Sequence, residues 1–369
     1  MRHLHLGKYY PPRHGGMETV LREQCRGLAA AGHAVQALVA GDRDAARWDD
    51  PDRRLRVVTC REAAVVASQP VVPGLPSRLR AAWRDWRPEA VTLHWPNPLA
   101  AAVLLALWRE APPGARLYVW YHADVTRQRA VAPLLAPLLG AVWRRAAGVA
   151  VSAAELRDRS PHLAAVRDRV RVIPFGIDPG GWRPAAGGPG ERFLFVGRLV
   201  YYKGLDVLLE ALARVPAATL DVVGDGPLRR RWRERARALG VADRVRWLGD
   251  VPDAELPALM AAARALVLPS TRTSETFGLV QLEAMAAGVP VIASRLPTGA
   301  GRVVVDGVTG RLVPPGDAAA LAAALRELSA DRERARRWGA AGRERFLDRY
   351  TRRRMTERLE AWYREPGRT

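Results

Sequence analysis

Short apolar runs alternate with amphipathic stretches along most of this chain. The run Met1–Leu6 predicts a strand, Gly7–Gly16 is a loop rich in glycine and proline, and the apolar positions of Met17–Ala31 fall on one face of a helix. The apolar run Ala34–Ala40 predicts the next strand. A doubly wound α/β fold begins with a strand, a glycine-containing loop, a helix and a second strand. Ligands of such a fold lie at the carboxyl ends of the strands.

The same alternation continues and starts again after a break. Residues 179–190 hold proline and glycine in quick succession, which is typical of a linker. Before this linker, further strands are predicted at residues 57–58, 90–93, 117–120, 149–152 and 170–173. After it, strands are predicted at 193–196, 218–223, 245–248, 265–268 and 289–293, and helices at 205–215, 228–239, 253–263, 279–287, 317–328, 331–346 and 351–364. Residues 306–310 predict a hairpin turn.

Length and composition indicate that the elements of this pattern form two domains. A chain of 369 residues is too long for one ordinary core, and 49% hydrophobic residues exclude general disorder. We expect two Rossmann-like, doubly wound α/β domains over residues 1–178 and 191–346, joined by the linker 179–190. The N-terminus has no secretory pattern, and no apolar run approaches the roughly 20 residues of a spanning helix, so we expect a cytoplasmic protein. Cys25 and Cys60 are the only cysteines, which predicts neither a disulfide framework nor a zinc cluster.

The formal charge of +20 suggests a polyanionic partner, either nucleic acid or an anionic membrane. Nearly every basic residue is arginine, however, and such a compositional bias raises the charge everywhere; Lys8 and Lys203 are the only lysines. No nucleic-acid-binding motif is present, so we expect no nucleic-acid partner. Two basic segments that contain tryptophan, 78–87 and 127–145, are typical either of helices lying on the inner face of the cytoplasmic membrane or of ordinary surface helices, and both interpretations remain open.

In the second half of the chain, the candidate ligand-binding residues lie at the ends of predicted strands. Glu275 lies near the start of the helix 279–287, where free N–H groups of Phe277, Gly278 and Leu279 could hold a phosphate or a sugar hydroxyl, and Glu283 follows in the same helix. Arg198 and Lys203 flank another strand-to-helix loop, and two cations at a helix start are what a diphosphate requires. A base could lie near Val251. Alternatively, Arg198 and Lys203 are two solvated cations on the surface that bind no ligand.

The first half of the chain has weaker candidate ligand-binding residues, which also lie at the ends of predicted strands. Gly15 and Gly16 would let the backbone approach a ligand, or they form a simple turn. His122 and Asp124 follow one predicted strand and Asn97 follows another, and a ligand hydroxyl could bind there. A single histidine at a strand end is more often structural.

Taken together, these features resemble the family 4 retaining glycosyltransferases, which have the GT-B fold. The resemblance covers essentially the whole chain and rests on Gly15-Gly16-Met17-Glu18, His122, Gly197-Arg198 with Lys203-Gly204, Gly224-Asp225-Gly226-Pro227, and Glu275 with Glu283 and the following Ala284-Met285-Ala286-Ala287-Gly288. It implies two domains facing each other across a cleft and a C-terminal helical segment, 347–369, that packs back on the N-terminal domain.

The resemblance also implies roles. Arg198, Lys203 and Gly15-Gly16 would bind the diphosphate of a nucleotide sugar, Glu283 its ribose, and Glu275 and His122 the transferred sugar. Asn97 and Asp124 are candidates for the acceptor. No metal or other cofactor is implied. The most similar members are mannosyltransferases of lipopolysaccharide or exopolysaccharide assembly, which implies GDP-mannose, with UDP-sugars next, and a lipid-linked or oligosaccharide acceptor. The alternatives are a nucleotide-sugar epimerase on the same fold and a polyanion-binding protein.

Overall fold

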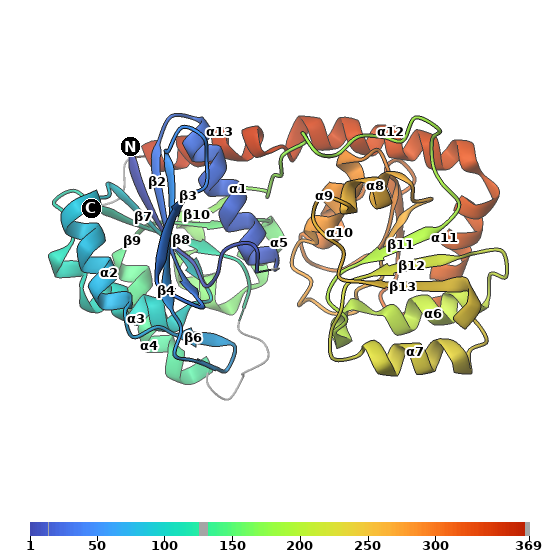
Figure 1. Ribbon diagram of the computed structural model, residues 1–369, viewed down its shortest axis with the longest axis horizontal. Coiled ribbons are helices and arrows are strands. Elements are labelled where there is room, and N and C mark those ends of the chain that lie inside the picture. Colours follow the sequence, from blue (N-terminus) through green and yellow to red (C-terminus); the bar gives the residue numbers. More distant parts are fainter. Residues whose placement is uncertain (14, 125–131, 366–369) are drawn as a thin grey trace. The chain divides into compact units, whose positions relative to one another are not determined.

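The computed structural model describes residues 1–13, 15–124 and 132–365, with only the backbone described for residues 132–134. The chain divides into two compact units (Figure 1). The first comprises Met1–Gly176 together with Arg352–Thr369, and the second comprises Ile177–Thr351. Each unit is built on a sheet of mainly parallel strands flanked by helices, which confirms the prediction of two Rossmann-like α/β folds.

The first unit holds an eight-stranded sheet with the order β10-β9-β8-β7-β1-β2-β4-β3. Its strands are β1 (Arg2–Leu6), β2 (Ala34–Gly41), β3 (Ala45–Trp48), β4 (Leu55–Arg61), β7 (Ala90–Trp95), β8 (Arg116–Tyr121), β9 (Ala146–Val151) and β10 (Val170–Val172). From β1 the chain passes to β2 on one side, and later elements continue from β7 on the other. The switch point, where a doubly wound sheet places its ligand, is therefore between β1 and β7.

Helices cover both faces of this sheet because crossover connections are right-handed and the strands progress in two directions. The helices of the first unit are α1 (Gly16–Ala30), α2 (Leu75–Ala81), α3 (Pro98–Ala106), α4 (Ala132–Arg145), α5 (Ala154–Arg159) and α13 (Arg352–Arg364). Residues of β1, β7 and β8 that point toward α2, α3 and α4 form the core, and Leu93 and Val119 within it have no exposed surface.

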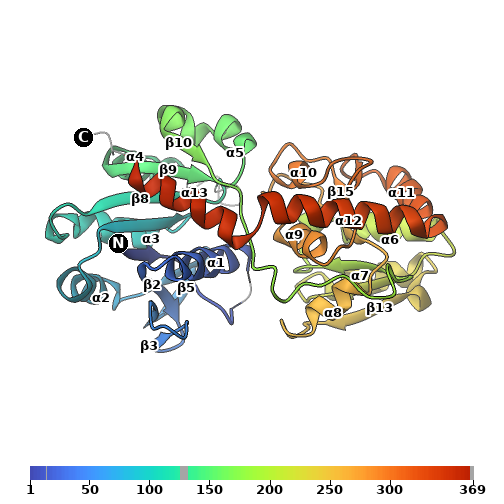
Figure 2. The same ribbon diagram turned by 90° about the horizontal axis from the view of Figure 1, so that it is seen from above.

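The last helix, α13, packs against α1, so the expected return of the C-terminal segment to the first unit is confirmed (Figure 2). A Cβ atom on Gly27 of α1 would lie 2.1 Å from the Thr356 hydroxyl of α13, so the two helices approach closely at this glycine. An ion pair of 2.7 Å between Arg352 and the buried Glu23 adds a polar contact. At the other end of α13, Trp362 packs against Gly148 of β9.

The second unit holds a six-stranded parallel sheet with the order β13-β12-β11-β14-β15-β16. Its strands are β11 (Phe193–Val196), β12 (Leu220–Val223), β13 (Val245–Gly249), β14 (Leu266–Leu268), β15 (Val291–Ser294) and β16 (Gly310–Val313). Its helices are α6 (Leu205–Ala213), α7 (Arg229–Ala238), α8 (Leu256–Ala261), α9 (Leu279–Ala286), α10 (Ala300–Val303), α11 (Ala318–Ala330) and α12 (Arg332–Arg349). The strand order reverses between β11 and β14, which makes this the switch point of the unit.

Some local predictions were wrong or incomplete. Residues 306–310 do not form a hairpin, because the following β16 pairs in parallel with β15 and not with an antiparallel neighbour. Four strands were not predicted, namely β16, β3, which pairs antiparallel with β4, and the small hairpin of β5 (Ala64–Val66) and β6 (Gln69–Val71). The expected linker residues belong to the second unit, where a Cβ on Gly190 would lie 1.8 Å from the carbonyl of Ala262.

The two basic segments that contain tryptophan turn their indoles inward. Trp83 and Trp143 are 5% and 6% exposed, and Trp143 donates a hydrogen bond to the carbonyl of His162. Arg84 and Arg144 lie at the surface. This pattern favours an ordinary surface helix over a helix that inserts tryptophan among lipid headgroups. Among the described residues, no helix has the length and apolarity needed to cross a bilayer.

Candidate functional site

In the second unit, two loops meet at the switch point. The loop after β11 contains Gly204, whose φ of 66° favours glycine, and a Cβ there would lie 2.1 Å from the carbonyl oxygen of Pro269 in the loop after β14. The backbone N–H of Thr271 donates to the carbonyl of Tyr202 at 2.8 Å. The sequence at these strand ends therefore brings two loops into direct backbone contact, and it places Lys203 beside Glu275.

Lys203 and Glu275 form an ion pair of 2.6 Å between Nζ and Oε2. The Ser270 hydroxyl donates to the same carboxylate oxygen at 3.0 Å. The two charged side chains are only 12% and 9% exposed. Burial acts to lower the pKa of Lys203, but the attraction of Glu275 outweighs it and the pKa is raised, so the amine stays charged. The pair is thus a buried ion pair at the carboxyl ends of two neighbouring strands.

Hydrogen bonds from polar side chains hold the segment that carries Glu275 in place. The carbonyl of Glu275 accepts from the Thr298 hydroxyl at 2.7 Å, and the Gln281 amide donates to the carbonyls of Phe277 and Ala300. Gly278, with φ of 71°, is the N-cap residue of α9. Ser270, Thr298 and Gln281 were missed from the sequence, since nothing in their spacing distinguishes them from other loop and helix residues.

The other predicted donor-binding residues surround this pair less tightly. Arg198 is exposed and follows Gly197 at the end of β11, so the predicted clamp of two free cations is instead one exposed arginine and one lysine bound to a carboxylate. Glu283 lies one turn into α9, and its charge also raises the pKa of Lys203. Val251 is half-buried beyond the end of β13. The side chain of Phe277 is buried, so only its backbone could meet a ligand.

The turn Gly224-Asp225-Gly226-Pro227 has a packing role. A Cβ on Gly224, where φ is 113°, would lie 2.3 Å from the carbonyl of Gly197, and one on Gly226 would lie 2.6 Å from that of Leu199. The turn therefore holds the loop that carries Arg198 by direct backbone contact. Glycine is required here for close approach.

In the first unit, His122 is the end of a line of three buried histidines. His5 Nδ1 lies 3.1 Å from His94 Nε2, and His94 Nδ1 lies 3.0 Å from His122 Nε2. The three rings come from β1, from its neighbour β7 and from the residue after β8, so the line crosses the sheet next to the switch point. Burial lowers the pKa of His122 to about 3, with a further contribution from the charge of Lys8, and burial also holds the pKa values of His5 and His94 well below the usual range. All three rings are therefore neutral at pH 7.

The predicted glycine loop lies near two half-buried side chains of opposite charge, Lys8 and Glu18. Gly15 precedes α1, and the Glu18 carboxylate folds back over it, since a Cβ on Gly15 would lie 2.1 Å from Glu18 Oε2. Burial lowers the pKa of Lys8, and the charge of Glu18 opposes that shift. Gly16 is exposed at the first position of the helix. The loop therefore combines an exposed backbone with a nearby lysine and carboxylate.

The two predicted acceptor residues already have partners in the first unit. Asn97 donates to the carbonyl of Gly7 at 3.2 Å and caps α3 by accepting from the N–H of Ala100. Asp124 accepts from the hydroxyls of Tyr121 and Ser160 at 2.7 Å and 2.5 Å. Both side chains position the strand ends that carry them. Part of the segment 127–145 lies outside the described residues.

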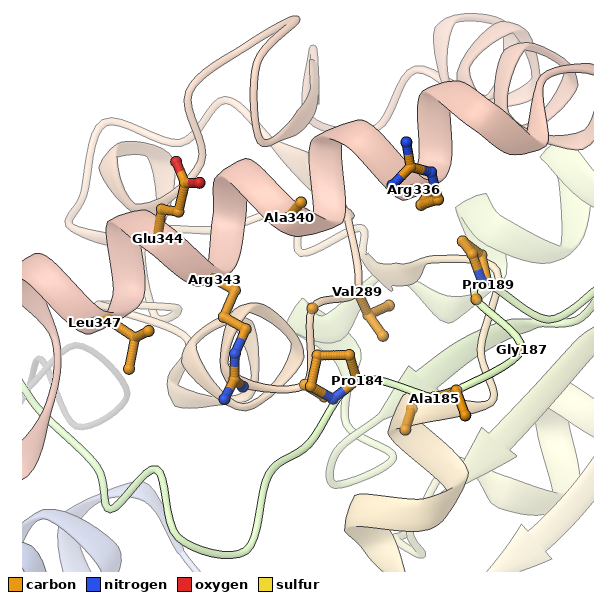
Figure 3. A pocket seen from close by; sticks show the side chains of 15 residues that line it. Pro184, Ala185, Gly187, Pro189, Val289, Arg336, Ala340, Arg343, Glu344 and Leu347 are labelled. Atoms are coloured by element: carbon orange, nitrogen blue, oxygen red, sulfur yellow. The ribbon is translucent and has the colours of Figure 1, made fainter.

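A cavity of about 650 Å³ in the second unit lies elsewhere (Figure 3). It is lined by residues 184–189, by the last residue of α8, by residues 287–289 after α9 and by α12. The guanidinium of Arg343, which points toward it, donates to the carbonyls of Trp182 and Ala286. With its cation used in this way and no carboxylate pair inside, this cavity is not the site that Lys203 and Glu275 define. Within the described residues, no three histidine, cysteine or acidic side chains are arranged as metal ligands.

The chain is similar to known proteins in both sequence and fold. Residues 184–345 match the family described as Glycosyl transferases group 1, and residues 14–180 match Glycosyltransferase Family 4. The chain is 31% identical over 363 residues, 95% of either chain, to the O-antigen chain mannosyltransferase C of Escherichia coli. It is 32% identical over 361 residues, 92% of either chain, to the GDP-mannose-dependent alpha-(1-6)-phosphatidylinositol monomannoside mannosyltransferase of Mycolicibacterium smegmatis. Among solved structures, the sucrose-phosphate synthase of Thermosynechococcus elongatus is similar with a TM-score of 0.82 at 25% identity, covering 99% of this chain and 98% of that one.

Proposed function

Because the chain belongs to the family 4 retaining glycosyltransferases of the GT-B fold, and so uses a nucleotide sugar, we propose that it moves a mannosyl group from GDP-mannose to a lipid-linked or glycan acceptor in the assembly of a bacterial polysaccharide. Two relatives that align over more than nine-tenths of the chain support the sugar, since both are named mannosyltransferases and one is named GDP-mannose-dependent. UDP-sugars are the next candidates for the donor.

The observation that carries the site assignment is the Lys203–Glu275 ion pair at the switch point between β11 and β14. Doubly wound folds bind nucleotides outside the carboxyl ends of the strands at this point. A diphosphate oxygen would take the place of the carboxylate as the partner of Lys203, and exposed Arg198 would add a second cation. Glu275, released from Lys203, would then accept hydrogen bonds from hydroxyls of the transferred sugar.

The reaction that follows from this arrangement is ionisation of the bond between the sugar and the diphosphate. Lys203 and Arg198 would stabilise the negative charge that develops on the leaving diphosphate. A phosphate oxygen would accept the proton of the attacking hydroxyl on the same face of the sugar, which gives retention. Glu275 is less suited to be a covalent nucleophile, because a carboxylate that accepts hydrogen bonds from the sugar hydroxyls is not positioned for attack beneath the ring.

The remaining predicted residues take supporting roles in the proposal. Glu283 would bind the ribose hydroxyls, Val251 would contact the base, and the N–H groups of residues 277–279 would meet the sugar or the phosphate. In the first unit, His122 would contact the transferred sugar and the exposed backbone at Gly15 and Gly16 would approach the phosphates. Asn97 and Asp124 would contribute to the acceptor site through the strand ends that they hold.

A screen of nucleotides and nucleotide sugars by thermal shift tests this proposal first, since a ligand that binds only the folded protein raises its melting temperature. GDP and GDP-mannose should give the largest shifts. Transfer should then be lost in Lys203→Ala and in Glu275→Ala. The exposed pair Arg230–Glu234, at 2.9 Å in the same unit, gives the matched controls Arg230→Ala and Glu234→Ala, which should keep full activity. Full activity in either site variant would contradict the assignment.

Two further measurements address the alternatives. Conversion of a nucleotide sugar into its epimer without an acceptor would favour an epimerase, whereas the proposal expects transfer that depends on the acceptor. A membrane partner would bind through exposed arginines, because Trp83 and Trp143 are in the core. Replacing Arg84 and Arg144 with alanine should then reduce sedimentation with phosphatidylglycerol vesicles, and unchanged sedimentation would refute that contact.

A further inference from the structure

The hydrogen bonds of the three-histidine line determine which nitrogen of His122, at the end of the line, carries the proton. Each of the three rings is neutral, so each carries one N–H and one unprotonated nitrogen. His94 bonds on both sides, to His5 through Nε2 and to His122 through Nδ1. A neutral ring cannot donate at both nitrogens or accept at both. Hence only two proton arrangements satisfy both hydrogen bonds, and they run in opposite directions along the line.

In one arrangement, His5 Nδ1–H donates to His94, His94 Nδ1–H donates to His122 Nε2, and His122 keeps its proton on Nδ1. In the other, every proton is on the opposite nitrogen of its ring, and His122 Nδ1 is a bare acceptor. The surroundings of His5, at the inner end of the line, distinguish the two proton arrangements. His5 Nε2 is fully buried and, in the part of the chain that the structure describes, has no hydrogen-bond partner. The first arrangement leaves a lone pair at that nitrogen, and the second leaves a buried N–H without an acceptor, which proteins avoid more strictly.

We infer that His5 and His94 are positioning residues that fix His122 in the Nδ1–H tautomer and so make it a neutral hydrogen-bond donor toward the sugar hydroxyl of the donor substrate. Among the described residues, Nδ1 of His122 has no other hydrogen-bond partner. The rings come from β1, from β7 and from the residue that follows β8, and because these three strands are neighbours, the rigid sheet sets the spacing of the line. The ligand part of this inference rests on the proposed function, whereas the tautomer does not.

The tautomer is measured directly on the free, full-length protein, without any nucleotide sugar. Protein labelled with ¹⁵N at histidine contains seven labelled residues, and a long-range ¹H–¹⁵N correlation spectrum identifies which nitrogen of each ring carries the proton. A His122→Gln variant assigns the signal. We expect a protonated Nδ1 and an unprotonated Nε2 at pH 7. A protonated Nε2, or a mixture of the two forms, would overturn the inference whether or not the protein transfers sugar.

Two variants of His5 test the positioning role. In His5→Asn, the side-chain amide N–H can replace Nδ1–H as the donor to His94, whereas His5→Leu has no donor. We expect the Nδ1–H form of His122 to persist in His5→Asn and to become a mixture in His5→Leu. Transfer should fall about tenfold in kcat/KM in His5→Leu, the effect of losing one oriented hydrogen bond, and should recover in His5→Asn. An unchanged tautomer in folded His5→Leu would refute the role of His5, and if that variant does not fold, the spectrum of the natural protein still decides the direction of the line. Absence of transfer by the natural protein would count against the proposed function alone.

Discussion

Lowering the pH from 7.5 to 5.5 should destabilise the first unit strongly and the second unit hardly at all. Burial is the main cause that lowers the pKa of His3 to about 2 and of His122 to about 3, and it holds those of His5 and His94 well below the ordinary value of 6.5. The folded state keeps these rings neutral, whereas the unfolded chain binds protons below about pH 6.5. Their contribution to stability is therefore complete above that pH and is lost as the pH falls.

The size of the effect follows from the difference in bound protons. Between pH 7.5 and 5.5, a histidine that protonates only in the unfolded chain lowers the free energy of unfolding by about 1.4 kcal/mol. Four such residues give about 5–6 kcal/mol, comparable with the total stability of many domains. Glu18, whose pKa burial raises, acts in the opposite direction and can offset at most about two of the four.

Hydrogen exchange followed by mass spectrometry measures both units in one sample. Peptides from β1 and β7 report on the first unit, and peptides from β11 and β14 report on the second, after correction for the intrinsic pH dependence of exchange. All seven histidines of the chain lie before residue 177, so the second unit is an internal control. His94→Gln should reduce the pH dependence of the first unit by about one histidine. Equal loss of protection in both units, or none in the first, would refute the reasoning.

Three further predictions concern packing and charge. Gly204→Ala should lower the melting temperature of the second unit by clearly more than Gly240→Ala, because both glycines have φ of 66° but only the first would clash with backbone. Glu275→Ala should cost about 3–5 kcal/mol in urea unfolding by leaving a buried lysine unpaired, and adding Lys203→Ala should restore part of that loss; additive effects would contradict a coupled pair. Gly27→Val should loosen α13 from α1 and increase exchange in α13, while unchanged protection there would mean that the helices do not approach as closely as the structure shows.

The sequence predicted most of the fold and the neighbourhood of the site, because both follow from repeating patterns. Alternating strands and helices predict parallel sheets, and residues at strand ends such as Lys203 and Glu275 then fall on one edge. Their mutual ion pair was not predictable, since it depends on two loops that pack together across 72 residues.

The histidine line was missed for the same kind of reason. Its hydrogen bonds join residues 89 and 28 positions apart, and they exist only because β1, β7 and β8 are neighbours in the sheet. The sequence indicated only His122, as a single histidine at a strand end. The strand β16 was missed because its apolar residues Leu312 and Val313 follow glycine and arginine and form too short a run to give a clear pattern.

The central claim is that Lys203 binds the diphosphate of the donor at the switch point of the second unit. Calorimetric titration of GDP and of guanosine into the natural protein, Lys203→Gln and Arg230→Ala tests it most directly, since the two ligands differ only in the diphosphate. The glutamine retains a donor for Glu275 but carries no charge. We expect Lys203→Gln to weaken GDP binding at least about tenfold while guanosine binding is unchanged, and Arg230→Ala to behave like the natural protein. Equal affinity of Lys203→Gln and the natural protein for GDP would contradict the claim.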